Sequence, residues 1–99
     1  MVYKIIWSPK ALQTFLANTE YLSKEWSKKE LDTFIAATNN KLQLLSAQPA
    51  IGVLSVKQKN IRKTLIGKRI LLIYRFQSRK KQIELLQFFN TWQHPDKMR

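Results

Sequence analysis

The sequence predicts a single α+β domain with an N-terminal strand, an antiparallel helical hairpin and a three-stranded antiparallel meander. Two observations support this fold class. Apolar residues recur at helical spacing between residues 9 and 45, and beyond Gly52 the pattern changes to short apolar runs joined by polar turns. The chain has 99 residues, 44% of them hydrophobic, which fits one domain over 1–99 with one modest core.

The helical hairpin is predicted from start and stop signals. An apolar strand over 2–7 precedes Ser8 and Pro9, which are typical of an N-cap and a first helical position. A first helix should follow and end near Trp26. Residues 27–30, Ser-Lys-Lys-Glu, form a capping box that begins a second helix directly afterwards. Pro49 should end that helix, and Gly52 permits a turn beyond it.

Three strands are predicted over 61–66, 69–76 and 82–89, with turns at 67–68 and 78–81. Both faces of these strands are apolar in the middle. In 69–76, the residues on one face are Ile70, Leu72, Tyr74 and Phe76, and those on the other are Arg69, Leu71, Ile73 and Arg75. In 82–89 they are Ile83, Leu85, Gln87 and Phe89 against Leu86 and Phe88. One helical hairpin covers one face only, so the second face should bind a partner or be covered by the C-terminal tail or a dimer mate.

Charge is distributed unevenly along the chain. Eighteen Lys and Arg against six Asp and Glu give a net charge of +12. Residues 1–56 carry six Lys and four acids, whereas residues 57–99 carry twelve Lys and Arg and two acids. The positive charge of residues 57–99 favours an anionic partner, namely a nucleic acid, a ribosome or an acidic protein. The alternative is a basic surface that serves solubility alone.

Other features of the composition narrow the classes of function. The chain has no cysteine, which excludes disulfides and thiolate chemistry, and one histidine with six acids predicts no metal site and no cofactor. No apolar run is long enough to span a bilayer, and no secretory leader is recognised, so a cytoplasmic protein without membrane contact is expected.

The order of these elements and five segments resemble the RelE/ParE family of type II toxin–antitoxin toxins, also called plasmid stabilisation proteins. The segments are WSPKAL at 7–12, YLSKEWSKKELDTF at 21–34, QPAIG at 48–52, IRKTLIGKRILLIYRF at 61–76 and IELLQFFNTWQHPDK at 83–97. The resemblance implies a cognate antitoxin as partner, with an acidic segment that folds as it binds. An uncovered sheet face also permits a homodimer.

The family has two main branches, and the resemblance leaves the enzymatic question open. One branch cleaves mRNA on the ribosome, and the other, ParE-like, poisons DNA gyrase without nuclease chemistry. The long hairpin and the terminal residues 88–95 resemble the ParE-like branch more closely. The alternatives are a RelE-like mRNA endonuclease and a degenerate relative that binds only its antitoxin.

The residues expected at a nuclease site are only partly present. RNA cleavage needs a group that accepts the 2′ proton, a group that protonates the leaving oxygen, and cations that stabilise the phosphorane. Arg62 stands at one cation position of the nuclease branch, but Thr64, Leu71 and Trp92 stand where others are common. The remaining catalytic candidates are Arg69, Arg75 and His94, whereas Tyr74 is interpreted as a core residue.

The same basic strands supply the candidates for partner binding. Three arginines lie inside predicted strands: Arg62, Arg69 and Arg75. Cations that only keep a sheet soluble are not required at such positions. The three arginines are therefore expected to form a face that binds an anion or an acidic antitoxin. The complete set of candidates is Arg62, Lys63, Arg69, Arg75, Arg79 and Trp92. Trp92 is also expected to fold back and cap the apolar second face.

Overall fold

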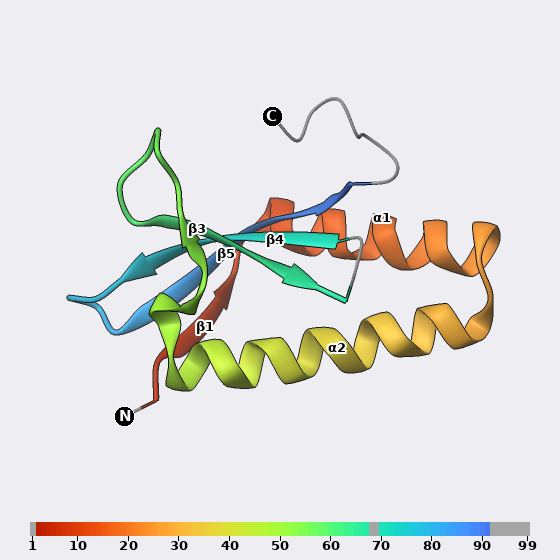
Figure 1. Ribbon diagram of the computed structural model, residues 1–99, viewed down its shortest axis with the longest axis horizontal. Helices are drawn as coiled ribbons and strands as arrows, with labels where there is room; N and C mark the ends of the chain where they lie inside the picture. Colours follow the sequence, from red (N-terminus) through yellow and green to blue (C-terminus); the bar gives the residue numbers. More distant parts are fainter. Residues whose placement is uncertain (1, 68–69, 92–99) are drawn as a thin grey trace.

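Two helices pack against one face of a five-stranded sheet in the computed structural model, which describes residues 2–67 and 70–91 (Figure 1). The elements in chain order are β1 (Lys4–Trp7), α1 (Pro9–Glu25), α2 (Lys28–Ala47), the 3-10 helix η1 (Pro49–Ile51), β2 (Val53–Leu54), β3 (Ile61–Ile66), β4 (Ile70–Gln77) and β5 (Gln82–Asn90). The predicted α+β class, the helical hairpin and the meander are confirmed.

The sheet has the strand order β1-β5-β4-β3-β2. Its meander strands pair antiparallel, as predicted, while β1 pairs parallel with β5. Two features were not predicted: the N-terminal strand lies beside the last strand, and the short strand β2 extends the sheet beyond β3. Neither helix in the described part of the chain combines the length and the hydropathy that a bilayer-spanning segment requires.

Both helices begin at the serines that the sequence predicts as caps. The Ser8 hydroxyl accepts a hydrogen bond from the Ala11 amide at 3.0 Å, with Pro9 at the first helical position. The Ser27 hydroxyl accepts from the Glu30 amide at 3.3 Å. These bonds satisfy amides that have no partner inside a helix. The two helices run antiparallel and are joined by two residues (Figure 1).

A β-bulge in β5 changes which of its side chains enter the core. Tyr74 pairs with Leu85, but its neighbour Ile73 pairs with Gln87, so Leu86 is an extra residue. Strict alternation predicts Gln87 and Phe89 on the face of Leu85, and this prediction is wrong. Because the bulge shifts the period by one, Phe88 faces the helices instead and is almost completely buried.

Helix α1 satisfies the backbone of β5 beyond the end of β1. The amide of Phe88 donates to the Thr14 hydroxyl at 2.9 Å, and its carbonyl accepts from the Asn18 side-chain amide at 3.0 Å. Asn18 is buried, and its amide also donates to the Thr14 carbonyl at 2.9 Å. The helix thus replaces a neighbouring strand, and this edge of β5 is not open to another chain.

Replacing Asn18 with leucine is expected to lower the free energy of unfolding by about 1–3 kcal/mol, because the Phe88 carbonyl would be buried without its donor. Leucine has the same number and branching of side-chain heavy atoms as asparagine but is bulkier, so the loss combines the missing hydrogen bond with some overpacking. Urea unfolding measures it, and Gln13→Leu on the exposed side of the same helix is the control. Equal stability of both variants would contradict this role of Asn18.

Candidate functional site

The face of the sheet opposite the helices carries an apolar centre with charged residues beside it, and this surface is called the open face below. The register places three rows of residues across β3, β4 and β5 on this face. Leu65, Leu71 and Phe89 form one row; Lys63, Ile73 and Gln87 form the next; Ile61, Arg75 and Glu84 form the third. The prediction of a second, partly apolar face is confirmed, and Lys63 and Arg75 stand within its rows.

A groove of about 390 Å³ lies where the β2–β3 hairpin meets the open face. Its lining comes from the hairpin and from the three meander strands: Val53, Leu54, Ser55, Val56, Lys57, Ile61, Arg62, Lys63, Leu71, Ile73 and Phe89. Val53 is 67% exposed and Val56 is 99% exposed, so one wall of the groove is an apolar hairpin that projects into solvent. Exposed apolar surface of this kind is typical of partner-binding sites.

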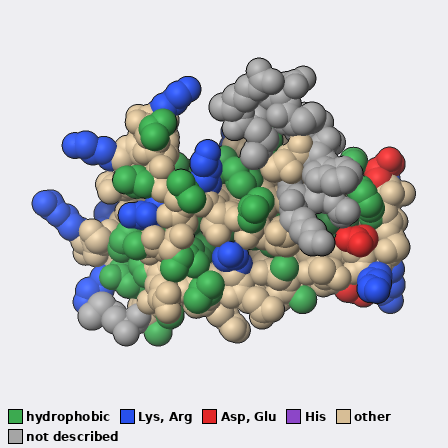
Figure 2. All heavy atoms as spheres, in the orientation of Figure 1, with side chains coloured by type: hydrophobic (Ala, Val, Ile, Leu, Met, Phe, Trp, Pro, Cys, Tyr) green, Lys and Arg blue, Asp and Glu red, His purple; other side chains and the backbone are tan. Residues whose placement is uncertain are grey.

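Cations gather at the end of the sheet beside this groove. The Phe76 amide donates to the Asn60 carbonyl at 2.8 Å, which joins the β2–β3 hairpin to the end of β4, just before the β4–β5 turn. Arg79 lies in that turn, and Lys57 lies in the hairpin. Figure 2 shows Lys and Arg side chains spread over this end, with hydrophobic side chains among them. The groove therefore combines apolar contact with attraction for negative charge.

Arg62 and Arg75 do not share a face, in contrast to the expected common surface. Arg62 pairs with Tyr74 and so lies on the helix side of β3, whereas Arg75 pairs with Ile61 on the open face. The Arg62 guanidinium donates to the carbonyls of Ala50 at 3.1 Å and Gly52 at 2.8 Å, so it ties η1 to the sheet. The sequence does not fix the register that decides these directions.

Arg75 and Lys63 are the predicted cations that the structure places on the open face. Arg75 Nη1 contacts the Glu84 carboxylate at 3.2 Å, a partly exposed ion pair that leaves four of the five guanidinium N–H groups outside this contact. Lys63 stands between Val53 and Ile73 in neighbouring strands and is exposed. Arg69, Trp92 and His94, for which roles are predicted above, lie outside the described residues.

Tyr74 is a core residue, as interpreted from the sequence. It is fully buried, its hydroxyl donates to the Pro49 carbonyl at 2.7 Å, and it accepts from the Gly52 amide at 3.0 Å. Burial raises the pKa of Tyr74, while the Gly52 hydrogen bond and the charge of Arg62 oppose the shift. The hydroxyl therefore stays protonated near neutral pH and is not accessible to a substrate.

The described residues supply binding groups more clearly than catalytic ones. The open face offers Lys63, Arg75 and Glu84 around an apolar floor, and residues 2–67 and 70–91 contain no cluster of carboxylates or imidazoles that could hold a metal ion. The sequence reasoning missed Val53 and Val56 as one wall of the groove. The signal was the β-branched run Val-Leu-Ser-Val directly after Gly52, which is typical of a short strand.

Comparison with known proteins identifies the family. The sequence model of the ParE toxin of the type II toxin–antitoxin system, parDE, matches residues 5–91. A mutant of the E. coli toxin RelE in the free state has a similar fold, with a TM-score of 0.67 at 15% sequence identity, over 96% of this chain and 90% of that one. No curated protein sequence matches the chain. Because the family match spans nearly the whole chain, the protein belongs to the ParE toxin family of type II toxin–antitoxin systems.

Proposed function

We propose that this toxin inhibits growth through DNA gyrase and is neutralised by a cognate antitoxin whose acidic, partly apolar segment occupies the open-face groove. The observation that carries the antitoxin part of the proposal is the groove itself. Its apolar walls, Val53 and Ile73 among them, lie beside Lys57 and Lys63. A segment that alternates apolar and acidic side chains would match both properties and would fold as it binds.

The gyrase part of the proposal is supported by the family and by the chemistry of the open face. The matching family model is that of the ParE toxin. On the open face, Leu71 and Ile73 fill the middle of β4, so the centre of this face is apolar where a nuclease needs groups that move protons. Arg62 supports η1 from the other side of the sheet, and Tyr74 is buried. A surface of this composition suits binding to a protein target better than acid–base catalysis.

Expression of the toxin in a bacterium that lacks the antitoxin tests the target. We expect growth arrest, induction of the DNA-damage response and intact mRNA, and we expect purified toxin to inhibit supercoiling by gyrase. Arrest with mRNA cleaved in translated regions would instead establish a RelE-like endonuclease. A folded, expressed protein that causes no arrest would identify a degenerate relative. Co-expression with the antitoxin is the control for toxicity.

A further inference from the structure

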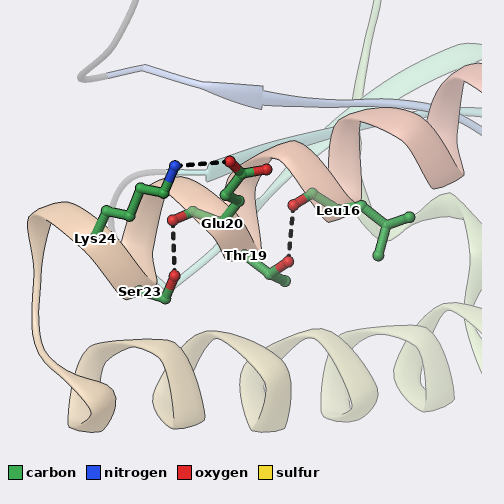
Figure 3. A network of polar contacts seen from close by, with 5 residues as sticks. All are labelled: Leu16, Thr19, Glu20, Ser23 and Lys24. Atoms are coloured by element: carbon green, nitrogen blue, oxygen red, sulfur yellow. Dashed lines mark hydrogen bonds and ion pairs between the residues drawn. The ribbon is translucent and has the colours of Figure 1, made fainter.

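Helix α1 carries a second row of residues besides the one that packs in the core, and all of them but the half-buried Thr19 are exposed. Leu12, Leu16, Thr19 and Ser23 follow one another at spacings of four, three and four, which is the repeat of the contact positions in a coiled coil. Leu12 is 50% exposed and Leu16 is 55% exposed. Figure 3 shows Leu16, Thr19 and Ser23 in a row along the helix. We call these four residues the α1 seam.

The α1 seam points away from the sheet. Thr14 and Asn18 mark the side of α1 that faces the sheet, because both hydrogen-bond to Phe88 of β5. A helix turns by about 100° per residue, so Leu16, two residues from each of them, lies roughly half a turn from the middle of that side. The α1 seam therefore lies on the opposite side of the domain from the open-face groove.

The polar members of the seam already have partners for their hydrogen-bond donors. The Thr19 hydroxyl donates to the Leu16 carbonyl at 2.8 Å, and the Ser23 hydroxyl donates to the Glu20 carbonyl at 2.8 Å. Beside them, Lys24 Nζ contacts the Glu20 carboxylate at 2.9 Å (Figure 3). Because these donors do not depend on water, covering the seam with another helix costs little in lost hydration.

Charge indicates which occupant suits the seam. Helix α1 contains two lysines and two glutamates and has no net charge, whereas residues 57–81 contain ten Lys and Arg and no acid. An acidic partner gains little attraction on α1. A second copy of the chain could dock there without bringing the two basic regions together, because the sheets would lie on the outside. Each packed layer adds about 10 Å, so the open faces would be roughly 30 Å apart, several times the screening length of about 8 Å.

We propose that two copies of this toxin associate through the α1 seam, with the open face of each copy left accessible. This arrangement goes beyond the proposed function and does not depend on it, since it uses the helix layer alone. The interface is isologous, with the same row of residues on both copies. If the antitoxin binds the open face as proposed above, one toxin dimer would bind two antitoxin segments at once, one on each outer sheet.

Sedimentation equilibrium of the purified, antitoxin-free chain tests this proposal. Weak association corresponds to dissociation constants of about 1 µM to 1 mM. As the concentration of the chain is raised through this range, we expect its average mass to rise from 11.7 kDa toward twice that value. Leu16→Glu and Leu12→Lys should each abolish the rise. Val53→Glu, on the groove at a site that is 67% exposed, is the matched control and should leave the rise unchanged.

Two results would overturn the proposal. One is a monomeric wild-type chain at every concentration up to about 1 mM. The other is association that Val53→Glu abolishes and both α1 variants retain, which would place the interface on the open face. Circular dichroism of each variant confirms that the fold is kept, and the use of two seam variants ensures that a single unfolded protein cannot decide the result.

Discussion

Replacing Gly52 with alanine is expected to destabilise the domain by about 2–4 kcal/mol, through overpacking and the loss of a buried hydrogen bond. A Cβ atom at this position would lie 2.5 Å from the Tyr74 hydroxyl and 3.0 Å from the Lys63 carbonyl. The backbone of Gly52 has a φ of −72°, which any residue adopts, so glycine is required here by the close approach of the tyrosine and not by its conformational freedom.

The effect should depend on the Tyr74 hydroxyl. Tyr74→Phe alone removes a buried group that donates to Pro49 and accepts from Gly52, at an expected cost of about 1–3 kcal/mol. In the double variant the alanine no longer meets the hydroxyl, while the contact with the ring carbon Cε1 at 2.9 Å remains. The double variant should therefore lose about 1 kcal/mol less than the sum of the two single losses. Urea unfolding of the four proteins measures this coupling, and Tyr21→Phe on α1 is the control for removal of a tyrosine hydroxyl outside this contact.

The raised pKa of Tyr74 gives the same contact a pH dependence. The unfolded chain releases this proton near its ordinary pKa of 10.0, whereas the folded chain holds it to higher pH. The contribution of Tyr74 to stability is therefore complete below pH 10 and declines as the pH rises toward the folded-state pKa. As the pH rises from 10 toward the folded-state pKa, the stability of the Tyr74→Phe variant should fall less than that of the wild type. Two results would together contradict this role of the contact between Gly52 and Tyr74. One is a double variant whose loss of stability equals the sum of the two single losses, and the other is the same dependence of stability on pH in the wild type and in Tyr74→Phe.

Much of the fold follows from local signals that a sequence displays directly. Ser8, Pro9 and Ser27 begin the helices where their side chains predict, and short polar turns predict the meander. The pairing of β1 with β5 was not predictable in this way, because it joins Ile5 to Ile83 across most of the chain. Patterns within one segment do not specify a neighbour so distant in sequence.

The candidate site was predictable only in part, for a related reason. The apolar middle of the open face follows from the alternation of β4, where Leu71 and Ile73 lie opposite the core residues. The direction of Arg62 depends on its pairing with Tyr74, and the position of Phe88 depends on the bulge at Leu86. The direction of Arg62 and the position of Phe88 both depend on how two strands pair, so the alternation within one strand could not predict them.

Reversing the charge of Lys57, Lys63 and Arg75 to glutamate is expected to weaken antitoxin binding by about 100-fold or more, since cations beside the groove would become anions facing an acidic segment. All three lie on or beside the open face, and none of their side chains is buried in the core, so the domain should remain folded. Titration calorimetry with the antitoxin measures the change. Circular dichroism verifies the fold.

A matched control separates local contact from net charge. Lys10, Lys28 and Lys29 are exposed residues in the first turns of α1 and α2, where glutamate is favoured by the helix dipole. Their reversal changes the total charge of the chain by the same amount, from +12 to +6, yet it leaves the groove intact. We expect this control to lose affinity only modestly and mainly at low salt, where long-range attraction is least screened. Equal losses in the two triple variants would mean that the antitoxin is attracted by the charge of the whole domain, and the groove would then not be its binding site.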